Sequence, residues 1–244
     1  MRAKSYPFTV GDVDCTVLLD GAFVRGREGI VRRFPDATES DYARAYADIG
    51  LSLDEADSSF NILLMRLGAE VILVDTGEAG KPHGGYLRES LHQAHTTPDA
   101  VTRVILTHAH GDHVLGLLTD DGAPMFPNAR YVMSAIEMDV WRARAVDNPQ
   151  HQAIISLLDA CGVQLIPMDA PILDGLHAVP LAGHTRGQIG LRLDSRGETL
   201  LHLADVLHSP MQFAHPEWSA SFDADTRVSV PTRRNALALA ADTQ

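Results

Sequence analysis

Three histidines and one aspartate stand close together in His108-Ala-His110-Gly-Asp112-His113, directly after the apolar run at residues 101–106. On extended backbone, residues two positions apart point the same way, so His108 and His110 can bind one ion together. Gly111 lets the chain turn, which directs Asp112 and His113 to a neighbouring position. Imidazole and carboxylate are the usual ligands of zinc and other first-row metals. A buried strand that ends at a metal site explains this segment better than a solvated histidine-rich loop does.

Two later segments supply partners for this cluster. His184 lies between glycines after a strand-like run, and Asp205 ends another apolar run. Alone, each is typical of a polar turn or a strand end. Beside the first cluster, His184 becomes a third histidine for the first ion and Asp205 a carboxylate that can bridge two ions. We assign seven other histidines to the surface: His83, His92, His95, His151, His177, His202 and His215.

Apolar runs typical of strands concentrate in two blocks, residues 8–74 and 163–203, with helical patterns between and after them. Gly68-Ala69 and Arg196-Gly197 are hairpin signals. Helices are predicted at residues 134–145, with a capping box of Ser134 and Glu137, and at 148–160 and 231–241. Two sheets packed face to face, with helices outside, is the architecture this order favours. We see no linker, so residues 1–244 are expected to form a single domain.

The motif series formed by His108 to His113, His184 and Asp205 resembles that of the metallo-β-lactamase-fold hydrolases. The resemblance covers most of the chain, including the hairpin that ends at Asp75-Thr76-Gly77. Residues 205–225 are similar to the lactonase and methyl-parathion-hydrolase-like branch. The resemblance implies an α/β fold, a four-layer αβ/βα sandwich of two mixed sheets flanked by helices. It also implies that His108, His110 and His184 hold one ion, that Asp112 and His113 hold a second, and that Asp205 bridges.

One departure from the family concerns the second ion. Family members with two ions usually end with a further histidine, beyond the helix that follows the bridging acid. Here no histidine follows His215, and His215 precedes that helix. Either the chain lacks its C-terminal segment or fewer protein ligands hold the second ion, and we assign no replacement.

The function implied is hydrolysis of a small ester or lactone by a metal-bound hydroxide, with two divalent ions, zinc first and Mn, Fe or Co as alternatives. Asp112 would orient the nucleophile and pass a proton to the leaving alkoxide. His208 is a second catalytic candidate that would hydrogen-bond the substrate, and a surface loop histidine is the equal alternative. Phosphotriester or thioester hydrolysis on the same site, and a non-catalytic module with an incomplete second site, stay open as alternatives.

Charge and cysteine content narrow the partners and the compartment. The formal net charge is −12, which disfavours nucleic acid and anionic membranes because few cations are there to meet phosphates. The two cysteines form no disulfide framework. No signal peptide or long apolar run is visible, so we predict a cytoplasmic protein. The expected partner is a small-molecule substrate, with no nucleic acid and no membrane, and a homodimer is left open.

Overall fold

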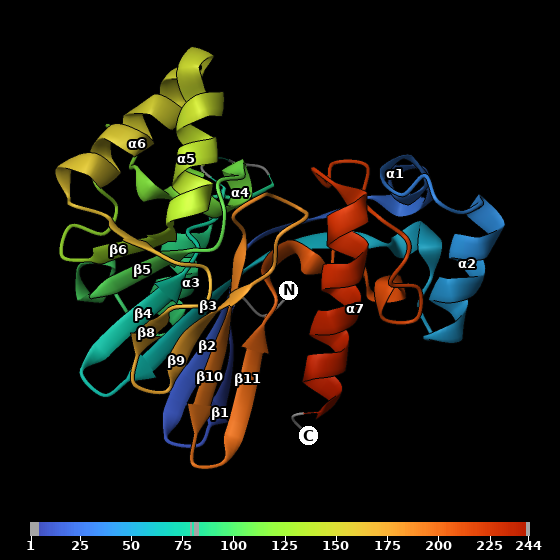
Figure 1. Ribbon diagram of the computed structural model, residues 1–244, viewed down its shortest axis with the longest axis horizontal. Helices are drawn as coiled ribbons and strands as arrows, with labels where there is room; N and C mark the ends of the chain where they lie inside the picture. Colours follow the sequence, from blue (N-terminus) through green and yellow to red (C-terminus); the bar gives the residue numbers. More distant parts are fainter. Residues whose placement is uncertain (1–4, 79, 81–82, 243–244) are drawn as a thin grey trace.

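The computed structural model describes residues 5–78, 80 and 83–242. Two β-sheets lie face to face with helices on both outer faces (Figure 1), which confirms the predicted sandwich. The larger sheet has the order β1 (Ser5–Val10), β2 (Val13–Val24), β3 (Asp57–Leu67), β4 (Glu70–Val74), β5 (Arg103–Leu106), β6 (Arg130–Ser134) and β7 (Gln164–Ile166). The smaller sheet has the order β11 (Glu198–His202), β10 (Ile189–Ser195), β9 (Leu176–Pro180) and β8 (Pro171–Leu173).

The two sheets differ in strand direction. In the larger sheet β1 to β4 pair antiparallel and β4 to β7 pair parallel, so this sheet is mixed. In the smaller sheet, β8 to β11 pair antiparallel. The hairpin predicted at Arg196-Gly197 joins β10 to β11, and both residues have positive φ, as the tight turn between twisted strands requires.

Alternation along the strands divides the core into two layers. On β3, Ile62 and Leu64 pack toward the outer helices, whereas Leu63 and Met65 pack between the sheets. Because successive side chains of a strand point to opposite faces, a sheet covered on both sides needs continuous apolar runs. This is why the run at residues 103–106 is fully buried and carries no alternation of polar and apolar residues.

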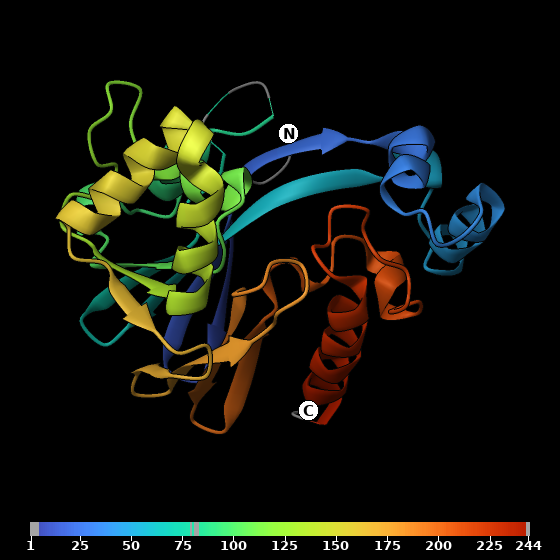
Figure 2. The ribbon, with the colours of Figure 1, turned by 45° about the horizontal axis from the view of Figure 1, so that its top comes forward.

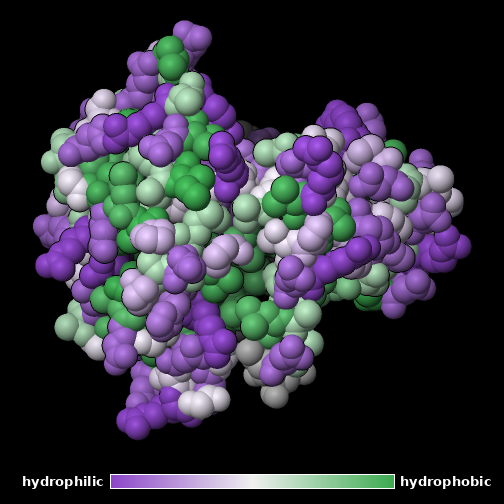
Figure 3. All heavy atoms as spheres, viewed as in Figure 1, coloured by the Kyte–Doolittle hydropathy of each residue, from purple (hydrophilic) through white to green (hydrophobic). Residues whose placement is uncertain are grey.

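The helices form the outer layers. Three of them, α3 (Leu87–Gln93), α5 (Ala135–Arg144) and α6 (Pro149–Ala160), cover the larger sheet. The last helix, α7 (Thr226–Asp242), packs near the smaller sheet through Ala236, which contacts Leu181 and Val206. In the view of Figure 3, hydrophilic side chains predominate around the outline, and apolar side chains appear in patches nearer the middle.

The terminal helix begins earlier than the sequence indicated. We expected it to start at Pro231, since proline favours the first position of a helix. It starts at Thr226 instead, and Pro231 lies inside it. Proline has no N–H, so the carbonyl of Arg227 cannot accept the usual hydrogen bond from residue 231.

A small helical lobe, α1 (Gly26–Arg33) and α2 (Glu39–Asp48), stands apart from the sandwich. The long strands β2 and β3 run out of the sheet and reach it (Figures 1 and 2). Its own apolar cluster joins Phe34 and Tyr42 to Met211 and Trp218 of the segment before α7. Residues 21–36 thus contain the end of β2 and helix α1, beside that segment. Among the described residues, no helix is long and apolar enough to cross a membrane.

Candidate metal centre

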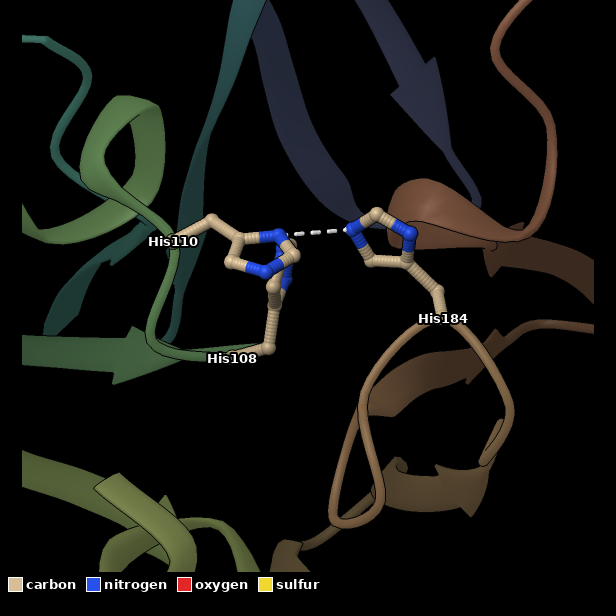
Figure 4. A group of neighbouring side chains, drawn as sticks. All are labelled: His108, His110 and His184. Atoms are coloured by element: carbon tan, nitrogen blue, oxygen red, sulfur yellow. Dashed lines mark hydrogen bonds between the residues drawn. The ribbon is translucent and has the colours of Figure 1, made fainter. Parts of the chain in front are cut away.

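Three histidine rings converge from two loops. His108 and His110 follow β5, and His184 lies in the loop between β9 and β10, with the rings turned toward one another (Figure 4). His110 Nδ1 lies 2.8 Å from His184 Nε2 and 3.1 Å from His108 Nε2. His108 and His184 are almost completely buried.

The spacing of these nitrogen atoms fits a tetrahedral metal ion. Ligand nitrogens about 2.0–2.1 Å from a zinc ion are about 3.3 Å apart in a regular tetrahedron. The N–N distances of 3.1 Å and 2.8 Å are shorter than that value by about 0.2 Å and 0.5 Å. Asp205 Oδ2 completes the group, at 3.4 Å from His184 Nε2 and 4.0 Å from His108 Nε2. The residues present therefore fit a metal ion of this kind.

A second group forms on the other side of Asp205. Its Oδ1 lies 3.4 Å from His113 Nε2, so the two oxygens of one carboxylate face the two groups. His108, His113 and Asp205 have donor atoms close enough to hold one ion. Asp112 Oδ2 lies 3.8 Å from His113 Nε2, outside the groups of close donor atoms, and Asp112 lines one cavity with His113 and Asp205.

His208 points into the site and is not a surface residue. Its side chain is 8% exposed, and Nε2 lies 3.3 Å from Asp205 Oδ2. It groups with His184 and Asp205, on the side of the first ion. Apart from this contact of Nε2 with Asp205, neither ring nitrogen has a hydrogen-bond partner among the described residues.

Carboxylates bind the ring nitrogens of two of these histidines that point away from the donor groups. Asp75 Oδ2 lies 2.8 Å from His113 Nδ1, and Asp223 Oδ1 lies 3.0 Å from His184 Nδ1. Such partners fix the tautomer that leaves the other nitrogen free for a metal. Asp75 has φ of 64°, and Ala204, beside Asp205, has φ of 45°. This uncommon backbone conformation places both acids, and it recurs at functional sites in general.

Glu137 joins the two histidine loops. Its fully buried carboxylate accepts hydrogen bonds from Ala109 N at 3.0 Å, from Thr185 Oγ1 at 2.7 Å and from Gly187 N at 3.0 Å. The predicted capping box is therefore wrong in one half. Ser134 does cap α5 by accepting from Glu137 N, but the Glu137 side chain turns to the loops instead of back to Ser134.

The electrostatics of the site favour neutral histidines in the first group. Burial, with the neighbouring His184, lowers the pKa of His110 to about 3. Burial also lowers the pKa of His108 well below its usual value. At His113 burial acts in the same direction, but the charges of Asp205 and Asp75 outweigh it and raise the pKa. A neutral imidazole is the form that binds metal, so the first group is ready for an ion near neutral pH.

Several residues of the site carried no recognisable signal in the sequence. Asp75 and Asp223 were not predicted as partners of the ligands, since each is a single acid distant from the histidines in sequence. His202 was assigned to the surface, and this was wrong, because its buried Nδ1 lies in the wall of a cavity of about 430 Å³ shared with His113 and Asp205.

Comparisons with known proteins give matches to a family model, to relatives in sequence and to solved structures. The family model of the metallo-beta-lactamase superfamily matches residues 59–244. The metallo-beta-lactamase domain-containing protein 1 of Xenopus laevis is 33% identical over 144 residues, which are 59% of this chain and 51% of that protein. Ribonuclease Z of Pyrococcus horikoshii is 42% identical over 55 residues, 22% of this chain and 16% of that enzyme. The chain thus aligns with about half of the first of these relatives and with less of the second.

Two solved structures are similar over nearly the whole chain. One is AidC, described as a dizinc quorum-quenching lactonase in complex with a product, with a TM-score of 0.86 and 26% identity. The match covers 99% of this chain and 89% of that one. The other is the hydrolase AbOPH, with a TM-score of 0.84 and 27% identity, covering 96% of this chain and 85% of that one.

Proposed function

This chain belongs to the metallo-beta-lactamase superfamily, and from this premise we propose that it is a metal-dependent hydrolase that cleaves a small ester or lactone. The observation that carries the proposal is the convergence of the ring nitrogens of His108, His110 and His184, with the carboxylate of Asp205 beside two of them. The lactone is favoured over other substrates because a similar structure, AidC, is described as a lactonase.

The metal ligands we propose are those suggested by the motif. His108, His110 and His184 hold the first ion, Asp112 and His113 take part in holding a second, and Asp205 lies between. When bound, such ions lower the pKa of water and polarise a carbonyl group. The second ion has fewer close protein donors here, so we expect it to bind more weakly than the first.

Side chains of this chain then serve the proton transfers. Asp112 is about one-third exposed, beside His113, where it can accept a proton from water and return it to a leaving alkoxide. His208 donates a hydrogen bond to the substrate from the other side of Asp205. This role is supported because, apart from the contact of Nε2 with Asp205, the ring nitrogens have no hydrogen-bond partner among the described residues.

Metal analysis and hydrolysis, measured on the same preparation, test the proposal. Protein purified without chelator should contain close to two ions per chain and open a simple γ-lactone, and chelator should abolish that turnover. Asp112→Ala should lower kcat/KM by about a hundredfold or more while the first ion is retained. Asp139→Ala, on an exposed position of α5, is the matched control and should leave turnover unchanged.

The alternatives give different results in the same assays. Faster turnover of a phosphotriester or a thioester than of any lactone would move the proposal to that substrate class. One ion or none, with no metal-dependent turnover on any substrate, would refute the enzyme and favour a binding module.

A further inference from the structure

Arg33 lies close to the candidate metal centre, near enough for the charges of Asp112 and Asp205 to act on it. It ends α1, and its guanidinium carbon stacks 4.3 Å from the centre of the Phe222 ring. That ring in turn contacts His184 and His208 edge-on, with centroid distances of 5.6 Å and 4.8 Å. Arg33 is half-buried, and among the described residues no carboxylate forms an ion pair with it.

A second arginine approaches the site from the other end of the same helix. Arg25 precedes α1, stacks 4.2 Å from the centre of the Phe23 ring and donates from Nε to Ser58 Oγ. It lines a cavity of about 380 Å³ together with Asp112 and with one other acid, Glu78.

The two guanidinium groups share one electrostatic environment. Burial and the charge of Arg33 lower the pKa of Arg25 to about 10, and Asp112 acts in the opposite direction. Burial also lowers the pKa of Arg33, whereas the negative charges of Asp112 and Asp205 act to raise it. Without ions, these two carboxylates are therefore the main negative charges near the arginines.

Metal binding would remove that balance. Once Asp112 and Asp205 are ligands of divalent cations, their negative charge is compensated, and both arginines face a site of positive charge. A guanidinium has only donors and matches the paired oxygens of a carboxylate or a phosphate. An anionic group on the substrate would restore the balance, and stacking on a phenylalanine ring holds each guanidinium flat for it.

We propose that Arg33, assisted by Arg25, binds an anionic group of the substrate, so that the preferred substrates are esters or lactones that also carry a carboxylate or a phosphate. This inference rests on the proposed hydrolase function and narrows its substrate class. Arg33 contributes to specificity and takes no part in proton transfer.

Paired esters test this preference through kinetics. Mono-para-nitrophenyl glutarate and para-nitrophenyl pentanoate have the same chain and differ in one terminal carboxylate. The wild-type enzyme should prefer the glutarate ester. Arg33→Ala should lower kcat/KM for that ester by about tenfold to a hundredfold, mainly through KM, and change the pentanoate ester by less than about twofold. Arg33→Lys should recover part of the loss, because it restores the charge without the paired donors.

Arg32→Ala provides the matched control. Arg32 is exposed on the same turn of α1, so its removal lowers the net charge equally without removing a contact with the substrate. Equal effects of Arg32→Ala and Arg33→Ala would overturn the proposal, because only the overall field would then matter. A wild-type preference for the pentanoate ester would overturn it too.

A binding measurement separates this inference from the hydrolase proposal. In calorimetry on the metal-loaded protein, each diacid should bind more tightly than the monoacid with the same number of carbon atoms. The pairs are succinate with butyrate, glutarate with pentanoate and adipate with hexanoate, and Arg33→Ala should remove the difference within each pair. Phosphate esters in the same assay show whether phosphate is the better ligand. A difference that Arg33→Ala removes supports the anion site even if no ester is hydrolysed. Equal binding of the diacids and monoacids refutes it even if hydrolysis is fast.

Discussion

Asp223→Asn tests whether a buried carboxylate sets the metal-binding form of His184. Asp223 is fully buried and accepts from His184 Nδ1 at 3.0 Å, from Ser229 Oγ at 2.8 Å and from Arg233 Nη2 at 3.1 Å. Its pKa is lowered, because the hydrogen bonds with His184 and Ser229 and the charge of His208 outweigh the effect of burial. The carboxylate is therefore ionised and accepts all three bonds.

The asparagine can accept only on one side. Arg233 always donates, so the amide oxygen should stay opposite Arg233 and the NH2 group should face His184 Nδ1. The imidazole proton then moves to Nε2, the atom that faces His110 and Asp205. We expect a loss of about tenfold to a hundredfold in zinc affinity, or about 1.4–2.7 kcal/mol. The neutral amide also pairs less strongly than the carboxylate with the buried Arg233. The free energy of unfolding of the metal-free protein should therefore fall by about 3 kcal/mol.

Competition with a chromophoric chelator measures the zinc affinity, and urea denaturation with chelator present measures stability. Ser229→Ala is the matched control, since it removes one hydrogen bond to the same carboxylate and leaves the bond to His184 in place. It should lower stability by about 1 kcal/mol and leave zinc affinity unchanged. If Asp223→Asn weakens zinc binding no more than Ser229→Ala does, the assignment of the tautomer to Asp223 is refuted.

Three further predictions concern the loops, the ion and a buried thiol. Glu137→Gln should lower the free energy of unfolding by about 2–4 kcal/mol in urea denaturation, because one of its three donors then faces an NH2 group, and a loss below about 1 kcal/mol would contradict this. Chelator should lower Tm in calorimetry by about 10 °C, since an ion at a thousandfold excess over its Kd stabilises a chain of this size by about 4 kcal/mol, and an unchanged Tm would speak against a tightly bound ion. Burial first, then Asp14, raises the pKa of Cys15 from 9.0 to about 11, so the stability linked to its thiol is present below pH 9.0 and lost as pH rises toward about 11. Wild type should lose about 2–3 kcal/mol more than Cys15→Ala over that range, measured by urea denaturation at each pH, and parallel curves would disprove the linkage.

The sequence was sufficient where the signal is local. His108, His110 and His113 lie within one short segment, and their geometry follows from a strand that ends in a turn. Strands, hairpin turns, the cap at Ser134 and the helix from residue 148 were predicted for the same reason, because each depends on a few neighbouring residues.

The sequence was insufficient where one residue serves a distant one. Glu137 occupies a position where a capping box is plausible, and only the folded chain brings Ala109 and Thr185 to its carboxylate. Asp223 likewise reaches His184 across 39 positions. The surface assignment of His202 failed because the burial of one histidine depends on how the two sheets pack, which no local pattern records.

The lobe of α1 and α2 has a consequence for how such a chain can change. Its apolar cluster shares no residue with either core layer of the sandwich. Arg33 lies on this lobe, whereas the proposed metal ligands lie on loops of the sandwich. Substitutions in α1 that alter which substrates are accepted can therefore accumulate without loosening the packing that supports the metal ligands. In evolution, the choice of substrate can therefore change through the lobe while the sandwich and its chemistry stay the same.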